Sequence, residues 1–353
     1  MIYTEIADEL LSVQLDLMRF EAGLRDAVLS TLTRMQAELV DKLKLADLTT
    51  FNKERMQILL AQCNKVIDAH YAAINSGVAT TTAGVAQVSA ASTAKAMETS
   101  IRVTLGAALP SEAFMERLAL NVLLDGAGFD DWWGRQRLDT RFRFARAVRL
   151  GVSQGETTEQ IVTRVAGAPR KGITGVMGVS RANARALVHT SVQALANEAR
   201  VETFRKNADI VDGIVWLATL DPATCIVCAV RDGREYTNED PPQPVGHDHA
   251  WNGGPGVIHW NCRCIATPRT KLFKDLGIDI DEPKVVARTS SSGPVSGNMT
   301  FEKFLNRKGK AFAEEVLGKG RAELWRSGKL TLEQLLDLSG NPMTLKQLRE
   351  KYL

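Results

Sequence analysis

Four of the five cysteines in the chain lie in one short stretch, together with a histidine. Cys225 and Cys228 form a Cys-x-x-Cys pair, and a later His-x-x-Cys-x-Cys run contains His259, Cys262 and Cys264. Thiolate and imidazole groups are the ligands that Zn²⁺ prefers, and a structural zinc site holds four of them in a tetrahedron. The spacing therefore predicts a structural zinc site that uses four of these five side chains. Asp221, four residues before the first cysteine, could cap the turn between the pair.

The same cysteines allow two other interpretations. They could pack as small apolar groups without metal, or they could form disulfides after release into an oxidising environment. Catalysis is a third possibility, but a zinc deaminase needs a glutamate two residues after its histidine, and Asn261 stands at that place after His259. A closed site of four protein ligands has no open position for water, so it would hold a small module together rather than catalyse a reaction.

A metal-dependent nuclease is the alternative enzyme. It would use His247, His249, Asn252 and His259 around an ion. These residues lie in a loop rich in Gly and Pro, for which solvated surface histidines are the simpler interpretation. The Gly-x-Ser-x-Gly run at residues 151–155 lies in a region predicted to be helical and does not connect a strand to a helix, so it forms no nucleophile elbow, and no carboxylate pair is suited to acid and base chemistry. We therefore predict no catalytic residues and no enzymatic activity.

The composition is that of a globular protein. The chain has 353 residues, of which 44% are hydrophobic and 24% are charged, and its net charge is +3. This length suits roughly two or three domains. A role in nucleic-acid binding would have to rest on a local basic patch. No run of about 18 apolar residues predicts a transmembrane helix, and the acidic N-terminal segment does not resemble a signal peptide. We expect synthesis in a reducing cytosol, where metal binding is favoured over disulfides.

The hydrophobic pattern predicts a mainly α fold with a small β-rich (α+β) module around the cysteines and histidine. Two long helices, broken near residues 46–50, should begin the chain. We expect the first to bury a stripe at Leu11, Leu15, Met18, Ala22 and Leu29, and the second to bury Cys63 in its core. The expected regions are an N-terminal helical docking region (1–110), a helical lead-in (111–205), the β-rich module (206–268), a flexible connector (269–299) and a helical tail (300–353).

Local signals mark several element boundaries. The β-branched and aromatic run 213–220 predicts a strand that leads to the first cysteine pair, and 265–268 predicts a strand after the second pair. Residues 289–294, rich in Ser and Gly, should be mobile. Capping boxes that start helices are expected at Thr157 with Gln160, Thr331 with Gln334, and Thr344 with Gln347.

A basic run in the lead-in predicts either a contact surface or a solvated helix face. Its members are Arg135, Arg137, Arg141, Arg143, Arg146 and Arg149. Helical spacing lets Arg135, Arg146 and Arg149 share one face, with Phe142 and Phe144 directed elsewhere. Such a face could contact phosphates of DNA or an acidic partner. The sequence leaves these interpretations open.

The order of motifs in the module resembles the phage Mu F-like minor head proteins, the head morphogenesis family of tailed phages. The resemblance rests on Thr219-Leu-Asp221, the Cys225 pair, Asp232-Gly233 and the His259-x-x-Cys262-Arg-Cys264 run, and it extends more weakly over residues 140–353. The chain departs from the family pattern in two places. The first is the His- and Gly-rich insertion Val245–Val257. The second is His189-Thr-Ser191, where the family often has an acidic residue.

The resemblance implies a virion protein present in the phage head and associated with the portal. It would act in head morphogenesis, capsid assembly and DNA packaging, with ejection alongside the genome as a further expectation. The implied partners are the portal and other head proteins, and also packaged DNA, with several copies in one assembly. The implied location is the virion, with the host cytoplasm as the site of assembly.

Overall fold

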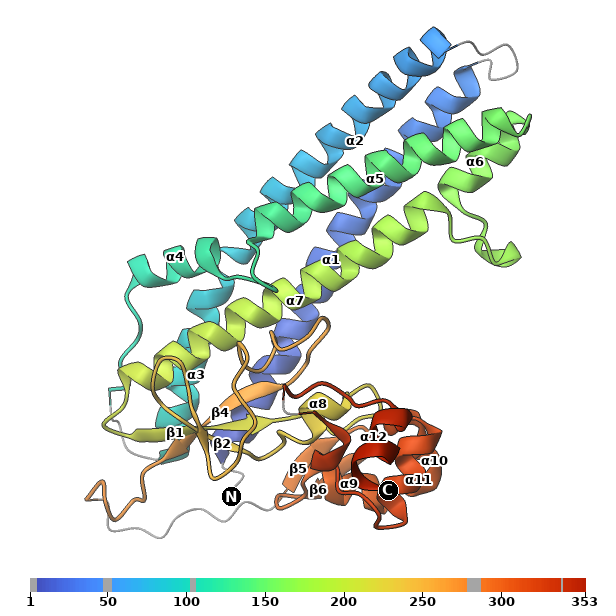
Figure 1. The fold of residues 1–353 in the computed structure, drawn as a ribbon. Coiled ribbons are helices and arrows are strands. Elements are labelled where there is room, and N and C mark those ends of the chain that lie inside the picture. The colour runs from blue at the N-terminus through green and yellow to red at the C-terminus, as the bar shows by residue number, and fades with distance from the viewer. Residues whose placement is uncertain (1–4, 47–52, 102–105, 278–286, 338) are drawn as a thin grey trace. The chain divides into compact units, whose positions relative to one another are not determined.

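The computed structural model describes residues 5–46, 53–101, 106–277, 287–337 and 339–353. It is mainly helical with a small antiparallel sheet, which confirms the expected fold class (Figure 1). The chain forms two compact units, and each unit is assembled from segments that are distant in sequence. The first unit comprises Met1–Leu15, Ala86–Met115 and Gln193–Leu353, and the second comprises Asp16–Val85 and Glu116–Val192. The compact units therefore do not follow the contiguous regions expected from the sequence.

The longer helices come before the sheet in the chain. They are α1 (Glu5–Leu45), α2 (Lys53–Thr82), α3 (Val85–Ile101), α4 (Glu112–Asn121), α5 (Phe129–Ser153), α6 (Thr158–Ala166) and α7 (Gly175–Lys206), with a short 3-10 turn η1 (Pro169–Lys171) before α7. The predicted capping box of Thr157 with Gln160 starts α6, which confirms that boundary. The predicted break at residues 46–50 falls almost entirely outside the described residues.

The buried stripe of α1 differs from the predicted one. Leu17, Leu24 and Val28 are buried, and the spacing of three and four continues to Leu43, whereas Leu15 and Met18 are 55% and 41% exposed. Both stripes satisfy helical spacing because they are offset by one residue, but only the observed stripe has large apolar residues along the length of the helix. The sequence pattern therefore identified the helix correctly and its buried face wrongly.

The second long helix buries an apolar stripe that includes Cys63. Leu59, Leu60 and Ile67 are buried, and Cys63 has no exposed surface. Burial raises the pKa of the Cys63 thiol to about 11, so this thiol is inert at neutral pH. Cys63 is therefore a core residue, as predicted.

The β-rich module contains a four-stranded antiparallel sheet in the order β3-β2-β1-β4. Its elements are β1 (Val211–Leu217), the one-turn helix α8 (Ile226–Ala229), β2 (Glu235–Thr237), β3 (Pro244–Val245) and β4 (Ile265–Thr270). Both predicted strands are present, and β1 pairs with β4 with Trp216 opposite Ala266. One core joins the sheet to helices from three parts of the chain, through Ile6 and Leu10 of α1, Met97 of α3 and Phe204 of α7.

The end of the chain forms a second core in the same unit, which we call the C-terminal lobe (residues 287–353). It consists of a hairpin of β5 (Ala287–Ser290) and β6 (Gly293–Ser296), the helices α9 (Phe301–Lys308), α10 (Lys310–Leu317) and α11 (Lys319–Arg326), the 3-10 turn η2 (Glu333–Leu335) and α12 (Leu345–Tyr352). The predicted box of Thr344 with Gln347 starts α12. Thr331 and Gln334 make both reciprocal hydrogen bonds, but they precede only the 3-10 turn.

The expected flexible connector is partly ordered. Residues 289–294 form the turn of the β5–β6 hairpin, with Ser290 paired to Gly293. The expectation of mobility at this segment was wrong because its composition gives no sign of its tertiary anchor, Arg288, which is buried in an ion pair with Asp232. Residues 278–286 of the connector lie outside the described residues.

Candidate metal centre

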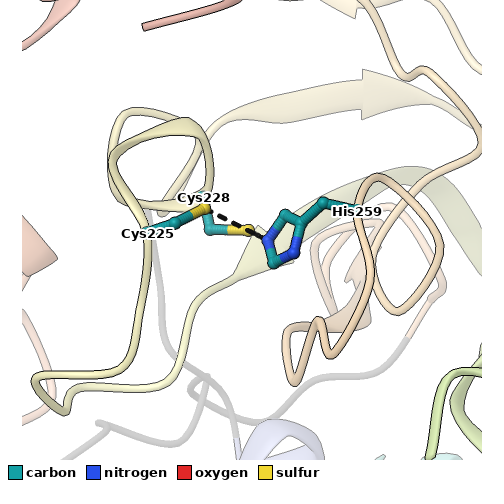
Figure 2. Close-up of side chains that lie close together, drawn as sticks. All are labelled: Cys225, Cys228 and His259. Atoms are coloured by element: carbon teal, nitrogen blue, oxygen red, sulfur yellow. Dashed lines mark hydrogen bonds between the residues drawn. The ribbon is translucent and has the colours of Figure 1, made fainter. Parts of the chain in front are cut away.

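The five predicted ligands converge at one place. Cys225 precedes α8, Cys228 lies within it, and His259 Nε2 lies 3.1 Å and 3.0 Å from their respective Sγ atoms (Figure 2). Cys228 Sγ lies 3.8 Å from Cys262 Sγ. The ligand atoms of Cys225, Cys228 and His259 lie within 4.8 Å of one another, as do those of Cys228, Cys262 and Cys264. Cys228 belongs to both groups, so the two groups form one cluster.

The geometry of this cluster fits a four-coordinate ion. A Zn–S distance of about 2.3 Å places two sulfurs of a tetrahedron about 3.8 Å apart, which matches the separation of Cys228 and Cys262. Cys228, Cys262 and Cys264 are buried, while Cys225 and His259 are half-buried. All five cysteines of the chain have free thiols, so no disulfide competes for these sulfurs.

Backbone groups around the cluster orient its ligands. His259 Nδ1 lies 2.9 Å from the carbonyl oxygen of Trp260, and donation to this oxygen directs the lone pair of Nε2 toward the sulfurs. The backbone N–H of Gly256 donates to Cys262 Sγ at 3.3 Å. Gly256 has a φ of +81°, and a Cβ there would lie 2.6 Å from Asn197 Nδ2, so glycine is required at this close approach.

Asn197 of α7 anchors the segment that carries the second cysteine pair. Its amide nitrogen donates to the carbonyl oxygen of Cys264, and its Oδ1 accepts from the backbone N–H of Ala266 at 3.2 Å. Arg200 Nη1 donates to the same Oδ1 at 2.7 Å and fixes the orientation of the amide. Sequence reasoning did not identify Asn197. The one available signal was its residue type, because Asn is a poor helix former that readily bonds to nearby backbone.

Asp221 does not cap the turn between the cysteine pair, because Cys225 occupies the N-cap position of α8. Asp221 has two other roles. Asp221 Oδ1 accepts from the backbone N–H of Ala223 at 2.9 Å and so shapes the turn before the first cysteine. The guanidinium of Arg263 bonds both carboxylate oxygens. Arg263 stands between Cys262 and Cys264, so this ion pair joins the loops that carry the two cysteine pairs.

The electrostatics of the cluster favour a bound cation. Hydrogen bonding with Cys228, and then with His259, lowers the pKa of Cys225 to about 5. Burial lowers the pKa of His259, but hydrogen bonds with Cys225 and Cys262 outweigh burial and raise this pKa to about 11. Hydrogen bonds also lower the pKa of Cys262 and raise the pKa of Cys228, so the negative charge of the cluster lies on Cys225 and Cys262, where a proton on the imidazole or a metal ion can balance it.

The histidines of the Val245–Val257 insertion have structural roles. His247 Nε2 donates to the carbonyl oxygen of Glu235, and its Nδ1 accepts from the backbone N–H of His249, so both ring nitrogens are in use. Trp251 packs edge-on against Trp216 and Tyr236. The insertion is a surface loop over most of its first half, as expected, but His247 and His249 are half-buried rather than fully solvated. Among the described residues, the metal-binding groups do not include His247 or His249.

The basic run on α5 divides into two sets. Arg137 and Arg141 bond Asp68, and Arg143 bonds Asp139. Arg135, Arg146 and Arg149 are exposed and form no ion pair within the described part of the chain. Phe144 is buried as expected, but Phe142 is 66% exposed. Phe142 lies seven residues from both Arg135 and Arg149, which is about two helical turns, so the expectation that it points away from this face was wrong.

A carboxylate lies beside the unusual His189-Thr-Ser191 segment. His189 Nδ1 of α7 contacts Glu21 Oε2 of α1 at 2.7 Å, and the Glu21 side chain is buried. The acidic group near this part of α7 is therefore supplied by α1.

The comparison with known families addresses the resemblance directly. Residues 143–267 match the family model described as Phage Mu protein F like protein. This segment of the chain is similar to the Mu F-like family. The match begins within α5, ends in β4 and contains all five candidate ligands, which confirms the resemblance seen in the sequence. The search of curated proteins and the search of solved structures gave no match. Within the described residues, no helix is both long and apolar enough to cross a membrane.

Proposed function

We propose that this Mu F-like chain is a minor head protein of a tailed phage. It acts in head morphogenesis, assembles in the host cytoplasm and becomes part of the virion head near the portal. The observation that carries the proposal is the convergence of five thiol and imidazole ligands within the segment that matches the family. The location of the labelled chain in images of intact particles and assembly intermediates tests this. A particle population complete without the chain would overturn the proposal.

The metal centre in this proposal is a structural zinc site. We assign Cys225, Cys228, Cys262 and His259 as its ligands. His259 Nε2 lies within 3.1 Å of two of these sulfurs, and Cys228 and Cys262 have the tetrahedral sulfur separation. Cys262 also hydrogen-bonds with His259, whereas Cys264 groups with Cys228 and Cys262. Four protein ligands close the coordination sphere, so the ion stabilises the module and leaves no position for a reacting water.

Metal analysis of the purified chain tests the site. The expected result is about one zinc per chain, as in other single structural sites, and loss of the zinc when Cys225 and Cys228 are both replaced by Ser. A metal-free preparation that is fully folded would reject the zinc site.

The alternative of a metal-dependent nuclease loses its support because His247 has both ring nitrogens bonded within the module. Incubation of the chain with duplex DNA and Mg²⁺ or Mn²⁺ distinguishes the two functions. The structural role predicts intact DNA. Cleavage that disappears in His247→Asn would establish the nuclease instead.

DNA contact is a second candidate role, favoured by the exposed arginines of α5. Arg135, Arg146 and Arg149 keep their charge uncompensated by an ion pair among the described residues. Packaged DNA offers the phosphates that such a face would bind. An acidic segment of the portal or another head protein is the competing partner, and exposed Phe142 would contribute apolar contact to it.

A further inference from the structure

The one-turn helix α8 has two faces that belong to different cores. Cys228, and Cys225 just before the helix, pack with the sheet and the metal centre. Ile226 and Ala229 of the same turn, with Val230 just after it, pack in the C-terminal lobe. Figure 1 shows α8 between the strands of the sheet and the orange and red elements of the lobe. A four-residue helix cannot be stable by itself, so its shape depends on what holds it on each side.

Asp232, three residues beyond α8, joins the lobe to the module through a buried carboxylate. Its Oδ2 accepts from Arg288 Nη1 at 2.8 Å and its Oδ1 accepts from Arg288 Nη2 at 2.7 Å. The backbone N–H groups of Ala218, in the module, and Phe301, at the start of α9, donate to the same carboxylate at 2.8 Å and 2.7 Å. The side chains of Asp232 and Arg288 are only 1% and 4% exposed. A buried ion pair persists only where such hydrogen bonds are complete, so small displacements of Asp232 are costly.

Arg231 adds a second connection at the same point. Its Nη1 donates to the carbonyl oxygen of Val227, and its Nη2 donates to the carbonyl oxygen of Ala250 in the His-rich insertion. A Cβ on Gly340 of the lobe would lie 3.1 Å from the same Nη2, so the lobe backbone packs closely on this guanidinium. Two consecutive residues after α8 therefore contact the lobe.

We propose that α8 couples the metal centre to the C-terminal lobe. With metal bound, Cys225 and Cys228 hold the turn in the shape that presents Ile226 and Ala229 to the lobe and Asp232 to Arg288. Loss of metal frees the turn and releases residues 287–353 from the module. This coupling rests on the proposed zinc site. Under this coupling, the attachment of the C-terminal lobe to the β-rich module depends on bound metal.

Hydrogen exchange of the full chain, with zinc bound and after treatment with a chelator, tests the coupling. The expected result is at least about tenfold faster exchange across the lobe after metal removal, which corresponds to about 1.4 kcal/mol. The amides of Phe301 and Ser291 should respond most clearly, because they donate to Asp232 and to the Leu220 carbonyl oxygen in the module. Exchange in α2, which lies in the other compact unit, should not change. Zinc loss without faster exchange in the lobe would overturn the coupling and leave the zinc site intact.

Zinc affinity of variants provides the reciprocal test, because coupling acts equally in both directions. Arg288→Met and Asp232→Asn should weaken zinc binding, measured by competition with a chelating indicator, by about 5-fold or more. Arg321→Met is the matched control. Arg321 also donates to backbone carbonyl groups of the lobe, at Met343 and Leu317, but has no bond to the module. Equal zinc affinity in Arg288→Met and the unmodified chain would reject the coupling but not the zinc site. A chain that binds no zinc would reject the zinc site and the coupling together.

Discussion

The guanidinium of Arg263 forms two hydrogen bonds of 2.6 Å with the carboxylate of Asp221. The two residues lie 42 positions apart, and each sits beside one of the cysteine pairs. The two ends of the metal centre are therefore joined by a direct protein contact as well as by the proposed ion. This geometry requires a planar, bidentate cation, which lysine cannot replace.

Replacement of Arg263 should weaken the module. Arg263→Met leaves the partly buried Asp221 without its partner, so we expect the free energy of unfolding to fall by about 1–3 kcal/mol. Urea unfolding of the zinc-bound chain measures this. Arg269→Met is the control, because its ion pairs with Asp212 and Glu235 lie on the sheet away from the cysteines. A smaller loss from Arg263→Met than from the control would contradict the joining role.

Ligand variants distinguish the coordinating residues. We expect His259→Ala to lose most bound zinc, because Nε2 faces two sulfurs, and Cys264→Ala to retain about one zinc per chain. Substitution with Co²⁺ supplies a spectroscopic measurement, since the intensity of the thiolate charge-transfer band follows the number of bound sulfurs. Cys63→Ala, which removes a core thiol far along the chain, should leave the spectrum unchanged. Zinc loss in Cys264→Ala together with retention in His259→Ala would show that the four thiolates are the ligands.

The insertion makes folding stability depend on pH through His249. Burial, together with the charges of Arg231 and Arg234, lowers the pKa of His249 to about 4, whereas an unfolded histidine has a pKa of about 6.5. Between these values the unfolded chain binds the additional proton, so the contribution of neutral His249 is present above pH 6.5 and is lost as the pH falls toward 4.

The measurement is urea unfolding at pH 7 and pH 5. We expect the loss of stability between the two pH values to be smaller in His249→Asn than in the unmodified chain. Protonation of the metal ligands affects the variant and the unmodified chain alike. The difference between their losses of stability therefore isolates the contribution of His249. Identical losses would show that this ring titrates normally in the folded state.

The α5 arginines predict a salt-dependent contact with DNA. Replacing Arg135, Arg146 and Arg149 with Gln should reduce the slope of log affinity against log salt by about 3, because each phosphate contact contributes about 0.9. The matched control replaces Arg137, Arg141 and Arg143, whose charges are already compensated by Asp68 and Asp139. A larger effect of the control set, or affinity independent of salt, would exclude phosphate contact by this face.

The metal centre could be predicted from sequence because ligand type and spacing are local properties. The Cys225 and His259 motifs specify donors that few other functions use together. The residues that position these ligands were harder to find. Asn197 acts through backbone carbonyl and amide groups across the fold, and its residue type alone does not identify which groups it contacts.

The errors in the predicted fold share a physical cause. The buried stripe of α1 and the position of Phe142 depend on which neighbour packs against a helix, and helical spacing alone permits more than one answer. Residues 289–294 were predicted as mobile because their composition gives no sign of the contact that holds the hairpin, between Arg288 and Asp232, 56 residues away. Local composition predicts whether a segment is ordered only when the contacts that stabilise the segment are also close to it in sequence.

The core beneath the sheet includes Ile6 and Leu10 from the start of the chain and Ala266 from β4. During synthesis, this core cannot be completed until β4 has been translated, about 260 residues after Ile6, and this delay leaves apolar surface exposed on the ribosome. The Mu F-like segment produced alone, as residues 143–267, would lack the apolar side chains that both α1 and α3 contribute to this core. Soluble expression of this segment should therefore require residues 5–15 and α3 to be supplied, either fused or as separate peptides.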